Sequence, residues 1–336
     1  MSPTRATLTD VARAAGVSVA TASRALSGTG QVSAATRMRV QRAARDAGYT
    51  RAGDGRGRPR AGSGGLIDLV LSGFDASWAE EAISGAVAEA VSRGYDLVLT
   101  TERDEPDEDW PMRIRARGSA GVVLGLIAPT RTQVAALRDA GIPIVLLDPR
   151  GESRLPAASV RTTDRQGGGD AAAHLVERGA ERFVVIGGVP AYRFGRARVG
   201  GFLDRLRHLR PDAPVEQVSS GWSMAAAGAG VRGPLRSARE AGARVGVFAC
   251  SDEMASGVYA AAAALGMTIP RDVMVVGFDD VREARWLAPP LTTVRQPIRA
   301  MAAAAVALLD SIEGRLDAAD DVVLPTSLVV RASTGR

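Results

Sequence analysis

Residues 7–28 read TLTDVARAAGVSVATASRALSG, and residues 32–49 continue with VSAATRMRVQRAARDAGY. Apolar residues recur in both stretches at the spacing of one helix face, and Gly16 separates two such segments. Short hydroxyl residues stand where helices should begin, which predicts three short helices capped at Thr7, Ser18 and Ser33. The turn around Gly16 spans about three residues, the length that a helix-turn-helix requires. The sequence therefore predicts an all-α helix-turn-helix domain over residues 1–50.

The second predicted helix carries side chains that suit DNA. Val19, Ala20 and Arg24 fall on its outward face, where a recognition helix meets base edges in the major groove. Arg24 can pair with guanine O6 and N7, and the alternative is a solvated surface arginine. Short hydroxyl side chains suit phosphate contacts, so the expected DNA contacts of this domain are Thr7, Ser18, Val19, Ala20, Thr21, Ser23 and Arg24.

Basic charge is concentrated at the start of the chain. Residues 1–50 contain seven Arg and two Asp, and residues 51–62 contain four Arg and one Asp. Because the whole chain carries +5, the remaining residues sum to −3. A positive head on a slightly acidic body indicates a DNA-binding module joined to a domain with another task. Residues 51–65 contain six Gly and no hydrophobic run, so we expect a flexible basic linker there.

Short apolar runs alternate with helical patterns through the rest of the chain. Strands are expected at 66–71, 97–99, 121–126, 144–147, 183–186, 245–249 and 273–278. This alternation predicts an α/β domain over residues 66–336, with parallel sheets in two successive lobes. Lobe 1 is expected over about 66–162 with a return segment near 291–320, and lobe 2 over about 163–290 with 321–336.

Several classes of protein are disfavoured. Cys250 is the single cysteine, no run of about 18 apolar residues occurs, and residues 1–10 mix Thr, Arg and Asp, so disulfides, a membrane span and export are not expected. His174 and His208 lie in helical patterns away from strand ends, and metal-ligand spacing is missing. We therefore expect a cytoplasmic, nucleoid-associated protein that is not an enzyme and needs neither metal nor cofactor.

Motifs beyond the helix-turn-helix stretch carry a family resemblance: RVGGF at 198–202, CSDEMASG at 250–257, VVGFDD at 275–280 and PPLTTVRQP at 289–297. With them, the chain resembles the lactose/galactose-repressor family along nearly its whole length. The resemblance implies a transcription regulator whose two-lobed, periplasmic-binding-protein-like domain binds a small effector and controls operator affinity. It also implies a homodimer on a pseudo-palindromic double-stranded DNA operator. No heptad tail typical of a tetramer follows Val330.

The linker departs from the family pattern. Family members usually continue with a hinge helix whose leucine enters the minor groove, and this chain has Arg58 at that position. The stretch RGRPR at 56–60 resembles the core of an AT-hook, which lays arginines along a narrow, A·T-rich minor groove. We therefore expect minor-groove contacts from Arg56, Arg58 and Arg60. A tether that adds only nonspecific affinity is the equally weighted alternative.

Polar and aromatic residues stand at or just beyond the predicted strand ends, where open α/β sheets bind ligands. Together with the resemblance, they predict an effector site made of Asp75, Trp78, Arg198, Trp222, Ser251, Asp252, Asp279 and Gln296. Carboxylates and Arg bond vicinal hydroxyls and aromatic faces stack on sugar rings, so a mono- or oligosaccharide is favoured. A purine or sugar-phosphate effector, and an activating or co-repressor-dependent regulator, are the alternatives. Taken singly, each residue also suits a helix cap, core packing or a surface ion pair.

Two further features each have two explanations. Trp286 suits either the rim of the effector site or the core. The glycine-rich stretch QGGG at 166–169 opens a predicted helix, where it suits either phosphate binding or, more favourably, close packing.

Overall fold

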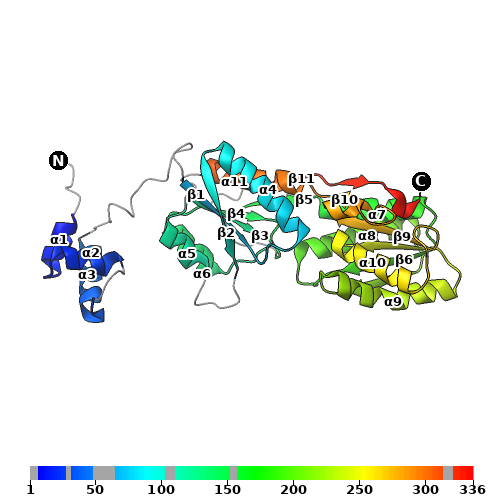
Figure 1. Ribbon diagram of the computed structural model, residues 1–336, viewed down its shortest axis with the longest axis horizontal. Helices are drawn as coiled ribbons and strands as arrows, with labels where there is room; N and C mark the ends of the chain where they lie inside the picture. The colour runs from blue at the N-terminus through cyan, green and yellow to red at the C-terminus, as the bar shows by residue number, and fades with distance from the viewer. Residues whose placement is uncertain are drawn as a thin grey trace. The chain divides into compact units, whose positions relative to one another are not determined.

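The structure, a computed structural model, describes residues 7–27, 32–47, 65–102, 110–151, 157–312 and 321–335. The chain divides into two compact units, residues 1–59 and 60–336. Figure 1 labels most of the helices and strands of both units. Within the described ranges, no helix is both long and apolar enough to cross a membrane.

The first unit contains three short helices: α1 (Leu8–Ala14), α2 (Val19–Ser27) and α3 (Ala34–Asp46). The predicted caps are present, since Thr7 and Asp10 form a capping box and Ser18 Oγ accepts from the Thr21 amide at 3.1 Å. Ser33 Oγ likewise accepts from the amide of Thr36 at 3.3 Å. The helices enclose a core of small apolar side chains: Val11, Ala12, Ala15, Ala22, Ala25, Val40 and Ala44.

Lobe 1 of the second unit is built on a parallel sheet with the strand order β11-β5-β4-β3-β1-β2. Helices α4 (Ser77–Ser92) and α11 (Ile298–Ser311) cover one face, and α5 (Trp110–Arg117) and α6 (Arg131–Asp139) cover the other. Alternate residues of a strand face opposite sides, so Leu69 packs toward α4 and α11 while Val70 packs toward α5 and α6. The strands are β1 (Gly65–Leu71), β2 (Tyr95–Thr101), β3 (Gly121–Gly125), β4 (Ile144–Leu147), β5 (Ala158–Thr162) and β11 (Asp321–Leu324).

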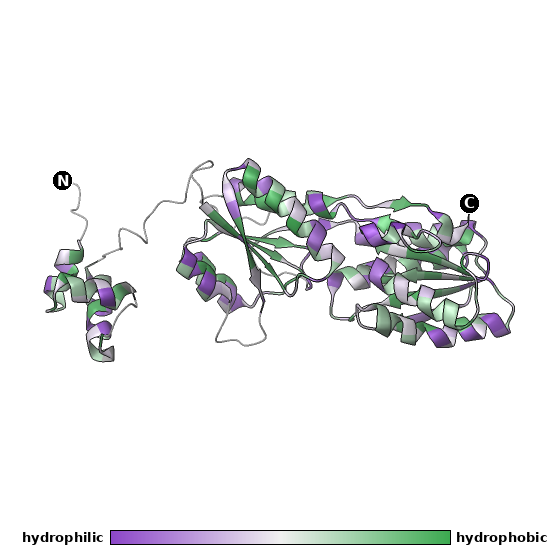
Figure 2. Cartoon of the chain, viewed as in Figure 1, coloured by the Kyte–Doolittle hydropathy of each residue, from purple (hydrophilic) through white to green (hydrophobic). Residues whose placement is uncertain are grey.

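Lobe 2 has a second sheet with the order β12-β10-β9-β8-β6-β7, in which only β12 runs antiparallel to its neighbour. Helices α7 (Asp164–Glu177) and α8 (Arg193–Leu209) pack together on this sheet, as do α9 (Met224–Glu240) and α10 (Asp252–Ala264). Figure 2 shows the apolar strands in the middle of each lobe, between helices of mixed polarity. The strands are β6 (Arg182–Gly187), β7 (Val215–Ser219), β8 (Val245–Ala249), β9 (Val273–Asp279), β10 (Thr292–Arg295) and β12 (Ser327–Val329).

The return segments differ from the expected lobe assignment. β10 belongs to lobe 2, because it pairs with β9 in parallel register, so within the described residues 291–312 of the predicted return segment it is α11 that packs on lobe 1. β11 belongs to lobe 1, where it pairs with β5, and β12 then crosses back to lobe 2. The chain changes sheets at Pro325 and Thr326, where proline has no amide hydrogen for a ladder and Thr326 bonds Thr163 instead. The sequence of a short strand does not indicate which sheet it joins, so the residue pattern could not predict where the chain crosses between the lobes.

Close packing explains the glycine-rich start of α7. A Cβ atom added to Gly168 would lie under 3.0 Å from the backbone carbonyl of Arg198, and one added to Gly201 would meet the carbonyl of Arg165 in the same way. Separations this short essentially never occur for real Cβ atoms. The backbones of α7 and α8 therefore touch directly, which favours the packing explanation of the glycines over phosphate binding.

Candidate effector site

A cavity of about 720 Å³ lies between the two lobes, at the carboxyl ends of the strands. Lobe 1 lines it with residues after β1, β3 and β4, including Ser72, Leu126 and Arg150. Lobe 2 adds Tyr192, Phe194, Met224 and the segments after β8 and β9. All eight residues that the sequence analysis placed in an effector site line this one cavity: Asp75, Trp78, Arg198, Trp222, Ser251, Asp252, Asp279 and Gln296.

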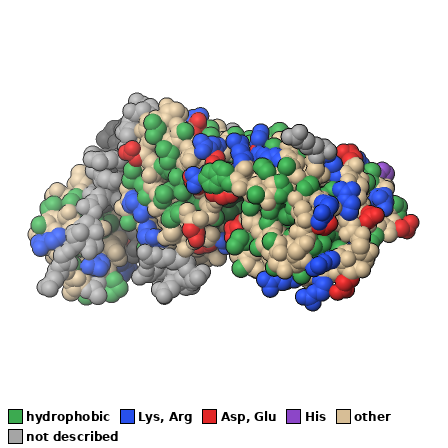
Figure 3. Space-filling model, turned by 45° about the vertical axis from the view of Figure 1, so that its right-hand side comes forward, with side chains coloured by type: hydrophobic (Ala, Val, Ile, Leu, Met, Phe, Trp, Pro, Cys, Tyr) green, Lys and Arg blue, Asp and Glu red, His purple; other side chains and the backbone are tan. Residues whose placement is uncertain are grey.

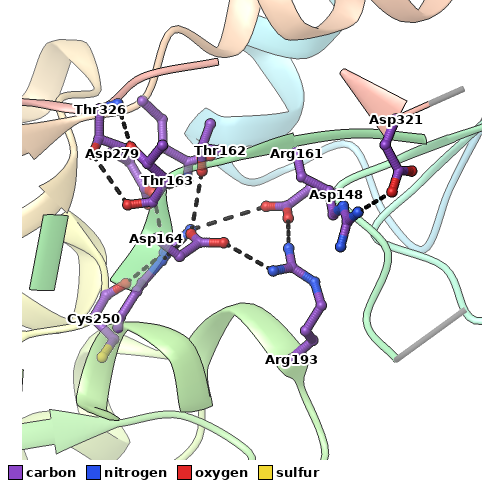
Figure 4. Close-up of polar contacts among 12 residues, drawn as sticks. Asp148, Arg161, Thr162, Thr163, Asp164, Arg193, Cys250, Asp279, Asp321 and Thr326 are labelled. Carbon is purple, nitrogen blue, oxygen red and sulfur yellow. Dashed lines mark hydrogen bonds and ion pairs between the residues drawn. The ribbon is translucent and has the colours of Figure 1, made fainter. Parts of the chain in front are cut away.

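Arg198 holds the polar centre of the cavity wall. Its side chain is 3% exposed, and its guanidinium also lies over the ring of Phe278, 3.8 Å from the centroid. Nε donates to Asp164 Oδ1 at 3.0 Å, and Nη1 donates to the carbonyl of Cys250 at 2.8 Å and to Asp279 Oδ1 at 3.4 Å. Figure 4 shows how these partners converge from α7, β8 and β9. Because a buried cation needs compensating acceptors, this network fixes the arginine in one position.

Asp279 is held in an unusual backbone conformation, with φ at +112°. Gln296 Nε2 donates to Asp279 Oδ1 at 2.7 Å, so the same oxygen receives bonds from Arg198 and Gln296. Burial raises the pKa of Asp279 to about 6. A backbone strained in this way persists only where its surroundings hold it, and such positions cluster at binding sites.

Ser251 and Asp252 have clear structural roles beside any binding role. Ser251 Oγ caps α10 by accepting from the Met254 amide at 3.2 Å. Asp252 accepts from the Thr293 hydroxyl at 2.6 Å and from the Val281 amide at 3.0 Å, and burial raises its pKa well above the ordinary value. Asp252 therefore ties α10 to β10 and to the loop after β9.

Beside Arg198, one part of the cavity wall is aromatic. Trp222 stacks on Tyr192 with ring centroids 6.0 Å apart and planes 12° apart, and Phe194 lies 5.2 Å from Trp222. Gly188 lets its backbone lie against the indole, since an added Cβ would overlap it. Arg150 of lobe 1 stands over the Tyr192 ring at 5.2 Å. The packed rings give a rigid platform at this side.

Several polar atoms of the lining have no hydrogen-bond partner among the described residues. Two are donors, the indole Nε1 atoms of Trp78 and Trp222. Three are acceptors, Asp148 Oδ2, Glu283 Oε2 and Gln296 Oε1. Because buried polar groups are nearly always bonded, atoms like these on a cavity wall favour a bound polar molecule with both hydroxyl donors and acceptors.

Sequence reasoning missed part of the lining. Asp148 directly follows β4, so the strand-end rule could have found it, and burial raises its pKa to about 7. Tyr192 and Phe194 flank the start of α8, where no local pattern marks them as site residues. For Trp286, the sequence analysis left open a place at the rim of the site or in the core. Its side chain is 69% exposed and belongs neither to the core clusters nor to the cavity lining. The guanidinium of Arg282 lies 5.5 Å from the centroid of its ring.

Comparison with known proteins gives the family. Residues 7–52 match the bacterial regulatory proteins of the lacI family, and residues 172–334 match the periplasmic binding protein-like domain. The HTH-type transcriptional regulator MalR of Streptomyces coelicolor is 34% identical, over 97% of this chain and 96% of that protein. An HTH-type transcriptional regulator encoded in the aml 5' region of Streptomyces limosus is 35% identical, over 100% of this chain and 96% of that protein. This chain belongs to the lacI family.

Solved structures of the lacI family share the architecture. The complex of the transcriptional regulator CelR with cellobiose has a TM-score of 0.71 and 30% identity, covering 98% of this chain and 100% of that chain. The lac repressor dimer bound to operator has a TM-score of 0.69 at 23% identity, which establishes similarity of fold. The chain is therefore a DNA-binding transcription regulator with a helix-turn-helix unit and a two-lobed effector domain, as the sequence predicted.

The helix-turn-helix of this lacI-family protein exposes part of the expected DNA-contact set. Val19 is 44% exposed, and Ala20 and Arg24 are also exposed on α2. Arg24 Nε donates to the Ala20 carbonyl at 3.2 Å. Ser18 and Thr21 share a hydroxyl hydrogen bond of 2.8 Å, so their first role is to begin α2. Ser23 is half-buried, and three further predicted contacts lie outside the described residues: Arg56, Arg58 and Arg60.

Proposed function

We propose that this lacI-family protein is a repressor whose operator affinity is controlled by a neutral mono- or oligosaccharide in the interlobe cavity. One observation carries the proposal: a packed aromatic cluster and a buried network of carboxylates and guanidinium lie side by side on the cavity wall, and both contain polar atoms without hydrogen-bond partners among the described residues. Sugars present an apolar C–H face for stacking and a rim of hydroxyl groups that donate and accept. The solved relatives that hold cellobiose and ribose support the same class.

The charge of the lining supports a neutral sugar over a phosphorylated one. Six carboxylate residues line the cavity, against Arg150 and Arg198: Asp75, Asp148, Asp252, Glu253, Asp279 and Glu283. Arg198 already serves buried carboxylates, and Arg150 pairs with Glu102 at 3.4 Å. A phosphate would enter an acidic site without a free cation to receive it, at a high desolvation cost.

We further propose that two chains form a homodimer on a pseudo-palindromic operator of nucleoid DNA. The operator complex of the lac repressor dimer supports this arrangement. Dimerisation multiplies modest half-site affinities through effective concentration. An effector that binds one arrangement of the lobes better than another then changes operator affinity, with a coupling of about 1–3 kcal/mol.

A thermal-shift screen of the full chain tests the effector class, because a ligand of the folded state raises its apparent stability. The panel contains glucose, galactose, ribose, cellobiose, maltose, xylobiose, their available phosphates, and purine nucleosides. We expect a neutral sugar to raise the melting temperature, and Asp279→Ala and Trp222→Ala to abolish the shift while Arg207→Met on the surface of α8 preserves it. A shift from nucleosides or sugar phosphates alone would refute the sugar assignment.

Operator binding completes the test. Fluorescence anisotropy with a labelled operator, with and without the sugar that binds, should change apparent affinity about 5- to 150-fold. Weaker binding with sugar identifies an inducer, and tighter binding identifies a co-repressor. An unchanged operator affinity in the presence of a bound sugar would contradict the proposed regulation.

A further inference from the structure

Arg193 connects the two lobes from behind the cavity wall. It is the first residue of α8 in lobe 2, and its Nη2 donates to Asp148 Oδ1 of lobe 1 at 2.6 Å. Its Nη1 donates to Asp164 Oδ2 at 3.2 Å, and its amide donates to the carbonyl of Arg150 in lobe 1 at 2.6 Å. Figure 4 shows the guanidinium of Arg193 between Asp148 and Asp164. Arg193 itself is not among the residues that line the cavity.

Arg193 binds Oδ1 of Asp148 and leaves the second carboxylate oxygen, Oδ2, available to a ligand. Asp148 lines the cavity with a side chain that is 1% exposed, and its Oδ2 has no hydrogen-bond partner in the described part of the chain. Arg198 Nη2 lies 3.9 Å from Oδ2, too far for a hydrogen bond, and donates none to the other described residues. A hydroxyl group beside both atoms, at about 2.8 Å from each, would donate to Oδ2 and accept from Nη2.

We propose that Arg193 is a positioning residue that fixes Asp148 Oδ2 as the acceptor for one particular hydroxyl of the bound sugar. The proposal rests on the sugar-binding function proposed above and adds the origin of its selectivity. Arg193 acts without touching the effector, by holding Oδ1 and by keeping lobe 1 against lobe 2 at this point. The backbone of Asp148 is also fixed, with φ at +45°, a conformation that non-glycine residues rarely adopt.

The charges around Asp148 make this acceptor depend on Arg193. Burial and the nearby Asp164 raise the pKa of Asp148, with a smaller contribution from Asp279, while Arg198 and Arg193 oppose the rise. Removing the Arg193 cation would therefore favour the protonated acid, which is a poorer acceptor. Above pH 7, where Asp148 is mostly ionised, losing the hydrogen bond to this charged acceptor on deoxygenation of the sugar should weaken binding about 10- to 100-fold. The site should therefore reject a sugar that lacks this one hydroxyl.

The experiment compares each monodeoxy analogue with its parent sugar by isothermal titration calorimetry, with cellobiose or the best-binding sugar of the panel as parent. In the unmodified protein, one analogue should bind about 10- to 100-fold more weakly than the parent. Asp148→Asn and Arg193→Met should both reduce this penalty to about threefold or less, and Arg193→Lys should restore most of it. Arg207→Met, which removes an exposed arginine of the same helix, is the matched control and should keep the full penalty.

A merely structural role of Arg193 would give a different result. Arg193→Met would then weaken parent and analogue equally, so the penalty would stay unchanged, and circular dichroism would report the loss of stability separately. An unchanged penalty in Asp148→Asn would also overturn the proposal. If no sugar of the panel binds the unmodified protein, the sugar-binding function fails first and this role fails with it.

Discussion

Replacing Gly168 with alanine should damage both the stability of lobe 2 and the effector site. Gly168 lies where α7 crosses α8, and its new Cβ would meet the backbone carbonyl of Arg198 at well under 3.0 Å. A carbonyl cannot rotate away as a side chain can, so the helices must separate by about 1 Å, and overpacking of this kind costs about 3 kcal/mol. Alanine returns about 1 kcal/mol through its helix propensity. The net expectation is a loss of about 2 kcal/mol.

Gly169 provides the matched control in the next position of the same helix. A Cβ there would lie 3.6 Å from its nearest neighbours, an ordinary van der Waals contact. Gly169→Ala should therefore stabilise the protein by up to about 1 kcal/mol. Urea unfolding followed by far-UV circular dichroism should separate the two variants by about 3 kcal/mol, with opposite signs relative to the unmodified protein.

The same substitution should reach the effector through Arg198. Its carbonyl is the atom that the new methyl group would displace, and its guanidinium organises the carboxylates of the cavity. A displacement of about 1 Å at such a site weakens binding by about tenfold or more. Calorimetric titration with the sugar identified in the screen measures this loss. Equal stability and equal sugar affinity of Gly168→Ala and Gly169→Ala would refute the packing argument.

Three other predictions concern protonation, base reading and the linker. Burial raises the pKa of Asp148 to about 7 and that of Asp279 to about 6, so in this range the folded state binds more protons than the unfolded chain. The unfolding free energy should therefore fall as pH rises from about 4 to 7, and Asp148→Asn should make that slope shallower in urea titrations. Arg24→Ala should weaken operator binding by about 1–3 kcal/mol in anisotropy titrations, and an equal loss on unrelated DNA would show a phosphate contact instead. Replacing Arg56 and Arg58 with alanine should weaken binding to operators with an A·T-rich centre more than to those with a G·C-rich centre; equal losses would leave a nonspecific tether.

The strand-end rule located the candidate site because of a property of parallel sheets. The carboxyl ends of the parallel strands lie at one edge of each sheet, and the cavity between the lobes is lined from both edges, so residues far apart in sequence, such as Asp75 and Asp279, come to line the same cavity. Taken singly, each of the eight residues also suited a purely structural role, such as a helix cap, core packing or a surface ion pair. Ser251 and Asp252 do have structural roles, since they cap and anchor α10. Neither role excludes the other, because both residues also line the cavity.

The sequence pattern could not predict contacts that form between residues of different lobes. Arg193 begins a helix like any exposed arginine, and only the tertiary structure brings it to Asp148, 45 residues earlier. The predicted sheet membership of β10 and β11 was wrong for the same reason, because strands of four residues are assigned by crossovers and not by their own periodicity. The fold also sorts charge: Figure 3 shows Arg and acidic side chains interspersed on the visible surface of lobe 2, whereas the charged residues of the cavity lining are mainly acidic.

The effector site lies next to the segments that cross between the lobes, so a bound effector would contact residues that connect lobe 1 to lobe 2. Asp164, which binds Arg193 and Arg198, follows directly on the first crossover, and Gln296 begins the second. Thr163 of the first crossover and Thr326 of the third bond each other through their hydroxyls at 2.9 Å. Gln296 belongs to the second crossover, Arg198 bonds Asp164 beside the first, and Asp148 is connected to Asp164 through Arg193, so a sugar hydroxyl bonded to any of the three would act close to a crossover. Lobe 1 begins at Gly65, the first described residue after the linker, so a small rotation there is what the DNA-binding unit would receive. On the role proposed for Arg193, its bonds to Asp148 and Arg150 hold the two lobes together before the sugar binds, and the effector can add only the difference in its affinity for two lobe arrangements.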